Sequence, residues 1–187
     1  PTRWQATGSV LARRMLDRAQ VVMRHLRSVR QVEEVNSVPG LYARSIGRLQ
    51  APDRWANATY VVRPSAPPQL EDELVAIGGR QWTRAPGGRW QLQPQGGTLP
   101  FRTPTLFTWS SYAEAVRLID VQHRRGHVTA TLALMDPGTP AWWTLHVDLA
   151  TDRVLDARLI TSGHFISTRY SQFNSAQPIL MPTGPRG

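Results

Sequence analysis

Five histidines are the side chains in this sequence that are best suited to hold a metal, because the chain contains no cysteine. None forms an H-x-x-x-H pair on a helix, since His123 and His127 flank a predicted turn at 124–126. These two histidines could approach each other across a hairpin, which makes them the candidate metal ligands. The two arginines between them oppose a cation, so the sequence favours exposed turn histidines and predicts no metal and no cofactor.

The hydroxyl and carboxyl groups do not form a catalytic pattern either. No serine lies in the G-x-S-x-G turn that presents a nucleophile. The stretch Thr161-Ser162-Gly163-His164 places hydroxyl groups near an imidazole in the sequence, but neighbouring residues of a strand point to opposite faces and the adjacency carries little weight. The thirteen acidic residues show no spacing that forces two carboxylates together. We therefore predict a protein that is not an enzyme.

The formal net charge is +9, and every basic residue is an arginine. The arginines are scattered singly or in pairs, whereas nucleic-acid binding proteins gather them in a stripe, so we predict no nucleic-acid partner. Arg24, Arg27 and Arg30 could touch anionic lipid headgroups. The chain opens at Pro1 without a basic or apolar leader, and we expect that any signal peptide has been removed.

The stretch Ile77–Gln93 contains Gly-Gly-Arg twice, each time followed closely by a tryptophan. A phosphate loop would need a helix start after the glycines, and none is present. Residues on both sides of Ala85–Gly88 instead alternate with period two, which predicts a hairpin that carries Trp82 on one strand and Trp90 on the other.

The rest of the chain predicts one long helix and a meander of strands. Ser9 is an N-cap residue, and the apolar stripe Leu11, Met15, Ala19, Val22 and Leu26 predicts a helix to about Ser28. A loop or lid at 94–104 and a short helix Ala113–Leu118 follow the first run of strands. Period-two alternation predicts strands at 30–36, 41–50, 54–62, 73–77, 80–84, 89–93, 119–124, 127–135, 142–149, 153–162 and 165–173.

The later strands each have one apolar side and one polar side, as sheets with one buried face do. The apolar sides are Val128, Ala130, Leu132 and Leu134, then Trp143, Leu145, Val147 and Leu149, then Leu155, Ala157 and Leu159. One helix of about twenty residues is too small to cover so many strands, which indicates an interior with room for an apolar ligand.

Three phrases resemble the LolA-like superfamily, which includes bacterial outer-membrane lipoprotein carriers and mycobacterial lipoproteins. They are Leu49–Trp55, Ile77–Trp82 and the late segment 145–153, with the closing strand 165–174 similar to the family's Tyr-x-x-Phe strand. The resemblance covers 11–174. It implies an α+β fold in which a curved, half-open antiparallel sheet carries an N-terminal helix and a short helix as a lid on its concave face. It also implies an apolar cavity for acyl chains and a location outside the cytoplasm.

We accordingly expect a single domain over 1–187, with frayed tails at 1–8 and 178–187. The predicted function is an extracytoplasmic, periplasmic or cell-surface, carrier of a lipid or acylated lipoprotein. The predicted cavity residues are Met23, Leu26, Trp55, Trp82, Trp143 and Phe173. An alternative is an interaction or sensor domain that binds a membrane-anchored partner or belongs to a larger membrane protein. The third alternative is a metal-handling domain that uses His123 and His127.

Overall fold

The computed structural model describes residues 8–38, 40–94, 107–124, 126–136 and 141–183. The chain divides into two compact units. The first comprises Pro1–His25 and Phe107–Arg169, and the second comprises Leu26–Leu106 and Tyr170–Gly187. Eleven strands occur in the described residues, all with antiparallel pairing inside each unit, so the predicted α+β class and antiparallel sheet are confirmed.

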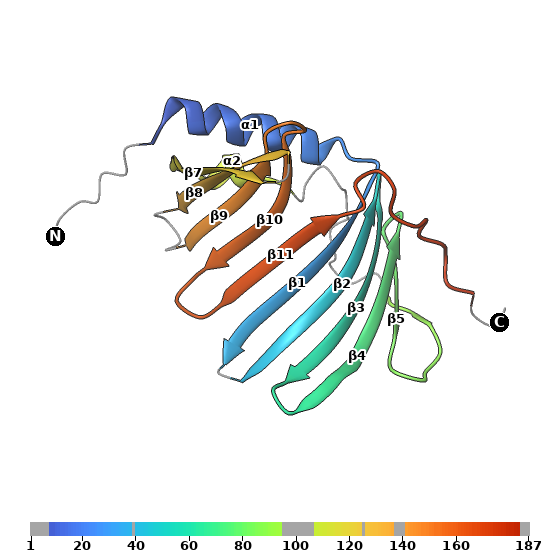
Figure 1. Ribbon diagram of the computed structural model, residues 1–187. Coiled ribbons are helices and arrows are strands. Elements are labelled where there is room, and N and C mark those ends of the chain that lie inside the picture. The colour runs from blue at the N-terminus through green and yellow to red at the C-terminus, as the bar shows by residue number, and fades with distance from the viewer. Residues whose placement is uncertain (1–7, 39, 95–106, 125, 137–140, 184–187) are drawn as a thin grey trace. The chain divides into compact units, whose positions relative to one another are not determined.

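The first unit combines two helices with five strands in the order β11-β10-β9-β8-β7 (Figure 1). Its longer helix packs against β7, β10 and the short helix. The last two residues of β11 belong to the second unit. The elements are α1 (Val10–Arg24), α2 (Trp109–Tyr112), β7 (Ala115–Arg124), β8 (His127–Asp136), β9 (Ala141–Asp148), β10 (Arg153–Ile160) and β11 (Phe165–Ser171).

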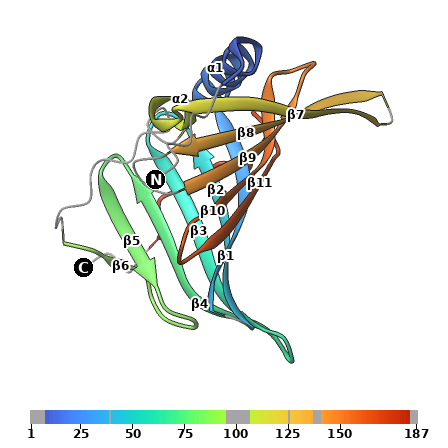
Figure 2. The same cartoon turned by 90° about the vertical axis from the view of Figure 1, so that its left-hand side faces the viewer.

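The second unit is a meander in which each strand pairs with the next along the chain, with β5 beside β4 and β6 beside β5 at the edge of the sheet (Figure 2). The β5–β6 hairpin is the one predicted from the Gly-Gly-Arg phrases, but its second strand is shorter than predicted, and Trp90 lies directly before β6 and not on it. Its turn is closed by the Gly88 amide, which donates to the Ala85 carbonyl at 2.9 Å. The elements are β1 (Ser28–Val38), β2 (Leu41–Gln50), β3 (Arg54–Arg63), β4 (Ala66–Ile77), β5 (Arg80–Arg84) and β6 (Gln91–Leu92).

Helix α1 begins where the sequence predicts, because the Ser9 side chain accepts a hydrogen bond from the Ala12 amide at 3.4 Å. It ends at Arg24, earlier than predicted, and β1 begins at Ser28. Of the predicted buried stripe, Ala19 and Leu26 are buried, although Leu26 lies beyond the end of the helix, and Met15 and Val22 are half-buried. The buried apolar residues of the helix are Ala12, Leu16, Ala19 and Met23, whereas Leu11 is 54% exposed. Alanines at positions 12 and 19 let the helix backbone approach the strands closely, which favours this stripe over its neighbour.

The two helices of the first unit are joined by a part-buried polar pair. The Gln20 side-chain amide donates to the Ser110 hydroxyl at 2.6 Å, and the Ser110 amide donates to Gln20 Oε1 at 2.8 Å. Arg13 adds bonds to the carbonyls of Ser110 and Ala113. These contacts position α2, which spans Trp109–Tyr112 and not the predicted Ala113–Leu118.

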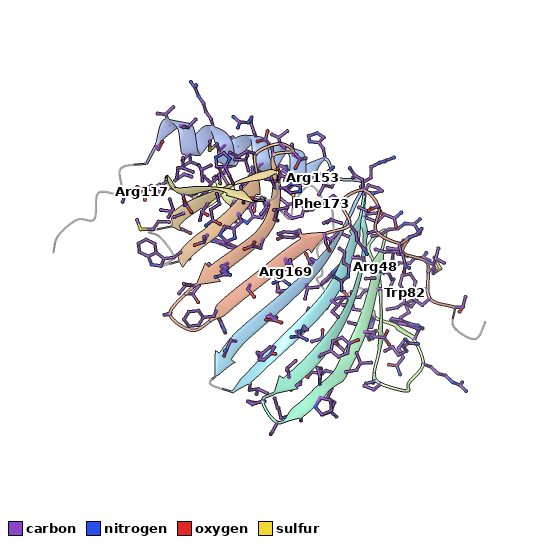
Figure 3. All side chains as sticks on the ribbon, viewed as in Figure 1. Arg48, Trp82, Arg117, Arg153, Arg169 and Phe173 are labelled. Carbon is purple, nitrogen blue, oxygen red and sulfur yellow. The ribbon has the colours of Figure 1, made fainter. Side chains whose placement is uncertain are left out.

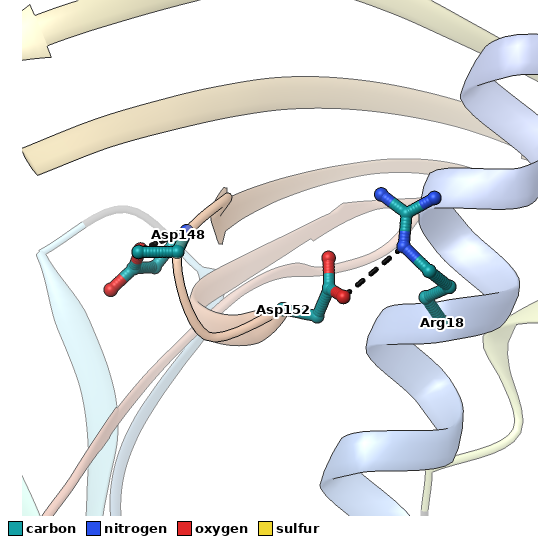
Figure 4. A network of polar contacts seen from close by, with 4 residues as sticks. Arg18, Asp148 and Asp152 are labelled. Carbon is teal, nitrogen blue, oxygen red and sulfur yellow. Dashed lines mark hydrogen bonds and ion pairs between the residues drawn. The ribbon is translucent and has the colours of Figure 1, made fainter.

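An ion pair joins α1 to the turn between β9 and β10 (Figure 4). Arg18 Nε lies 3.1 Å from Asp152 Oδ2. Asp152 has a φ of 51°, so the turn places a residue in the left-handed region directly beneath the helix. None of the described helices has both the length and the apolar character required to cross a membrane.

Candidate functional site

The apolar face of the first unit is built from every second residue of neighbouring strands. The register pairs Leu132 with Leu145, and Leu145 with Ala157, so these side chains share one side of the sheet. All three are at most 2% exposed. The opposite side carries polar pairs such as His146 and Asp156, whose Nδ1 and Oδ1 lie 2.7 Å apart. The buried stripe of α1 therefore covers the apolar side.

Helix α1 does not bury this face completely. Trp143 pairs with Leu134 on β8 and with Leu159 on β10, and Leu159 pairs with Ile166 on β11. Leu134 is 1% exposed. Trp143, Leu159 and Ile166, however, are only half-buried. The apolar face thus continues from a closed core into a row of partly exposed aromatic and aliphatic side chains, which could contact an apolar ligand.

Of the residues predicted to line a cavity, Met23 and Trp143 belong to the first unit. Met23 is fully buried on α1, and Trp143 lies on the sheet face that the helix covers. The other four belong to the second unit, where Leu26 is 3% exposed and Trp55, Trp82 and Phe173 are half-buried.

Trp55 and Trp82 lie on opposite faces of the second unit. Trp55 pairs with Leu49 and Ala76, while Trp82 pairs with Val75, the neighbour of Ala76 on β4. Because neighbouring strand residues point to opposite faces, one hollow on this sheet cannot take both indoles. Trp82 instead packs with Trp90 in the cluster formed around Ala56, Val75 and Ile179.

The C-terminal segment closes that cluster. Ile179 is 1% exposed, although it lies in the stretch 178–187 that was predicted to fray. Its carbonyl accepts a hydrogen bond from Arg54 Nη1 at 2.8 Å, and its amide donates to Gln50 Oε1 at 2.9 Å. These two bonds and the burial of one isoleucine hold the segment on the sheet.

Beside the cluster is an open hollow of about 150 Å³. Apolar side chains line most of it, with Arg48 and Glu73 as the charged groups. Figure 3 shows Arg48 on β2 and Trp82 on β5 of the same unit. Reasoning from the sequence missed Arg48, although its place in the alternation of β2, two residues after Ile46, could have assigned it to the face of Val32 and Ala58.

The histidine pair does not form a metal site. The hairpin register pairs His123 with Val128 and Arg124 with His127, which places the two imidazoles on opposite faces. Both histidines are exposed. Among the described residues, no group of three His, Cys, Asp or Glu side chains could hold a metal ion.

Solved structures share the fold of this chain. The chain is similar to LprF from Mycobacterium bovis, with a TM-score of 0.69 and 14% identity over 95% of this chain and 100% of that chain. It is also similar to the lipoprotein LppX of Mycobacterium tuberculosis, with a TM-score of 0.60 and 12% identity over 90% of this chain and 97% of that chain. The chain has a LolA-like fold. No protein-family model matches the sequence, and no curated protein sequence matches it.

The LolA-like fold was expected from three short stretches of sequence, and the structure shows which elements these stretches form. Leu49–Trp55 forms the β2–β3 turn, Ile77–Trp82 forms the β4–β5 turn, and 145–153 forms the β9–β10 turn. All three phrases are connections between antiparallel strands. This explains why they identify the fold and do not identify a ligand.

Proposed function

We propose that the protein is an extracytoplasmic carrier that binds the acyl chains of a lipid or of an acylated lipoprotein. The observation that carries this proposal is the incompletely covered apolar face of the first unit. A LolA-like fold would use such a face, between sheet and helix, to shield acyl chains from water.

The ligand would lie along the half-buried row Trp143, Leu159 and Ile166. Each methylene moved from water onto such a surface contributes about 0.8 kcal/mol, so about ten methylenes would contribute roughly 8 kcal/mol before the entropic cost of binding. Met23 lies on the helix that covers this face. It would contact the acyl chain when the helix moves away from the sheet. For Leu26, Trp55 and Phe173 of the second unit, a role in lining the cavity remains a prediction. Trp82 lies on the opposite face from Trp55, so we no longer propose it as a residue of the same cavity.

The structural neighbours support a location in the cell envelope, since LppX is a lipoprotein. We propose the same location for this chain. A single carrier domain over the whole chain, acting without a cofactor and without chemical turnover, fits the lack of a catalytic pattern in the sequence.

Native mass spectrometry of protein purified from a bacterial host tests the proposal. We expect one or more lipid masses bound to the folded protein, and their release when the protein is denatured. A spectrum that contains only the mass of the bare chain, together with no uptake of added radiolabelled phospholipid, would contradict it.

A protein-interaction or sensor domain is the second candidate, and one observation favours it. On the polar side of the first unit, Ile160 pairs with Trp142 and with Phe165. Trp142 is 46% exposed, Ile160 is 45% exposed and Phe165 is 62% exposed. A photocrosslinker placed at Phe165 in the host envelope would capture one defined protein if this candidate is right, and would capture lipid or nothing if the carrier function is right.

A further inference from the structure

A pair of arginines faces each other across β1 and β2 in the second unit. The register pairs Arg30 with Arg48, and it continues the same row through Ala56 and Val75 to Trp82. Arg30, Arg48 and Trp82 therefore lie on one face of the sheet (Figure 3 labels Arg48 and Trp82). Two like charges that are directly opposite in a sheet repel each other, so this pair destabilises the protein unless an anion lies between or beside them.

The rest of the described sheet supplies no such anion. Within the described residues, neither Arg30 nor Arg48 forms a hydrogen bond or ion pair, and both are half-buried. Other arginines on the same face do have partners. Arg44 Nη2 lies 2.8 Å from Glu34 Oε1, and Arg54 donates to the Ile179 carbonyl.

Arg48 also lines the hollow of about 150 Å³. The one carboxylate that lines the hollow belongs to Glu73, and its Oε2 already accepts from Arg84 Nε at 2.8 Å. Arg84 in turn lies over the Trp90 ring, with its guanidinium carbon 4.6 Å from the ring centroid. Glu73 is thus held by Arg84, and the charge of Arg48 faces the hollow without compensation from it.

The remaining lining is mostly apolar. It is formed by Ile46, Ala56, Ala58, Leu74, Val75 and Trp90, with Asn57 beside them. An open hollow of about 150 Å³ has room for a short apolar segment of a ligand. The face therefore offers two positive charges beside a small apolar hollow.

We propose that Arg30 and Arg48 bind the carboxylate or phosphate head of a small amphiphile, whose first methylenes lie in the hollow against Ile46 and Trp90. Guanidinium groups recognise both anions through paired, charge-assisted hydrogen bonds. This site lies on the face of the second unit that carries Trp82, opposite the face that carries Trp55. It does not depend on the carrier function of the first unit.

Isothermal titration calorimetry tests the site with four probes: decanoate, decyl phosphate, the neutral decyl maltoside and inorganic phosphate. We expect decanoate or decyl phosphate to bind the full chain at least about tenfold more tightly than decyl maltoside, because only the anions compensate the arginine pair. The tighter of the two anions identifies the source of the head group. Inorganic phosphate should bind at least about tenfold more weakly than decyl phosphate, because it lacks the apolar segment.

The variants are Arg48→Gln and Arg30→Gln, with Arg63→Gln as the matched control. Arg63 is an exposed arginine at the end of β3, and among the described residues it forms no hydrogen bond or ion pair. We expect Arg48→Gln to weaken anion binding by about tenfold or more and Arg63→Gln to change it by less than about twofold. Arg48→Gln should also unfold at the same temperature as the parent or higher, because one of two repelling charges is gone.

Equal binding of the anionic and neutral decyl probes, or equal anion affinity of Arg48→Gln and Arg63→Gln, would overturn the proposal. The same titration of Trp143 variants detects anions that bind to the apolar face of the first unit instead. Such binding would survive Arg48→Gln and would be weakened by changes at Trp143. Failure of the arginine site and failure of the carrier function are therefore distinguishable.

Discussion

Trp142 and Trp143 are neighbours in the sequence, but β9 places them on opposite faces of the first unit. Trp142 pairs with Met135 and Ile160, whereas Trp143 pairs with Leu134 and Leu159. Trp143 thus belongs to the apolar side that α1 covers, and Trp142 belongs to the exposed polar side at 46% exposure. The pair is a matched probe for which face binds an acyl chain.

We expect Trp143→Ser to lower the affinity for a fluorescent fatty acid by about tenfold or more, because the ligand loses the apolar surface of one indole. Trp142→Ser should change the affinity by less than about twofold. Tryptophan quenching by a brominated fatty acid supplies a readout that does not depend on stability. Loss of quenching in Trp142→Phe, with full quenching retained in Trp143→Phe, would place the ligand on the wrong face for a carrier.

The packing of Ile179 predicts that the C-terminal segment stabilises the second unit. Ile179→Ala should lower the free energy of unfolding by about 2–4 kcal/mol, since it removes a fully buried side chain from the cluster of Ala56 and Val75. Leu180→Ala is the control, because Leu180 is 74% exposed. Urea denaturation followed by tryptophan fluorescence measures both, and Trp82 and Trp90 of the same cluster report on it. Equal midpoints for the two variants would show that the segment is not anchored there.

The strands and turns of this chain were largely predictable, because the signals for them are local. Alternation located most strands, and Ala85–Gly88 located the β5–β6 hairpin. The start of β4 was missed. Pro67 and Pro68 indicate a turn, but they lie in the strand at an interruption of the β3–β4 register, where Val61 pairs with Gln69 and Arg63 with Ala66. An irregular position can take a proline because no ladder hydrogen bond is lost there.

The positions that were mispredicted depend on distant parts of the chain. Ala115–Leu118 reads equally well as a helix or a strand, and its pairing with Leu132–Met135 decides for the strand. In β10 a register shift between Val154 and Asp156 brings Val154 to the buried face, where Leu155 was expected. Arg48 was not predicted as a site residue, because the sequence of β2 alone does not show that its cross-strand neighbour is Arg30.

The polar pair between the helices predicts a specific loss of stability. Gln20→Ala removes both hydrogen bonds to Ser110 and leaves the Ser110 amide and hydroxyl without those partners. The expected cost is about 1–3 kcal/mol in the free energy of unfolding. Asp17→Ala, an exposed change on the same helix, should cost less than about 0.5 kcal/mol. Chemical denaturation of the two variants compares them, and a Gln20→Ala variant as stable as Asp17→Ala would show that the pair is not formed in solution.

The turn at Asp152 separates the effect of an ion pair from the effect of backbone conformation. Arg18→Ala removes the ion pair with Asp152, and because Arg18 is 52% exposed the expected cost is below about 1 kcal/mol. Asp152→Gly removes the same pair but suits the φ of 51°, so it should cost no more than Arg18→Ala. Asp152→Val loses the pair and also places a β-branched residue in the left-handed region, which adds about 1–3 kcal/mol. Thermal unfolding should therefore rank Asp152→Val well below the other two variants. If Asp152→Gly and Asp152→Val unfold together, the ion pair and not the backbone conformation holds this turn beneath α1.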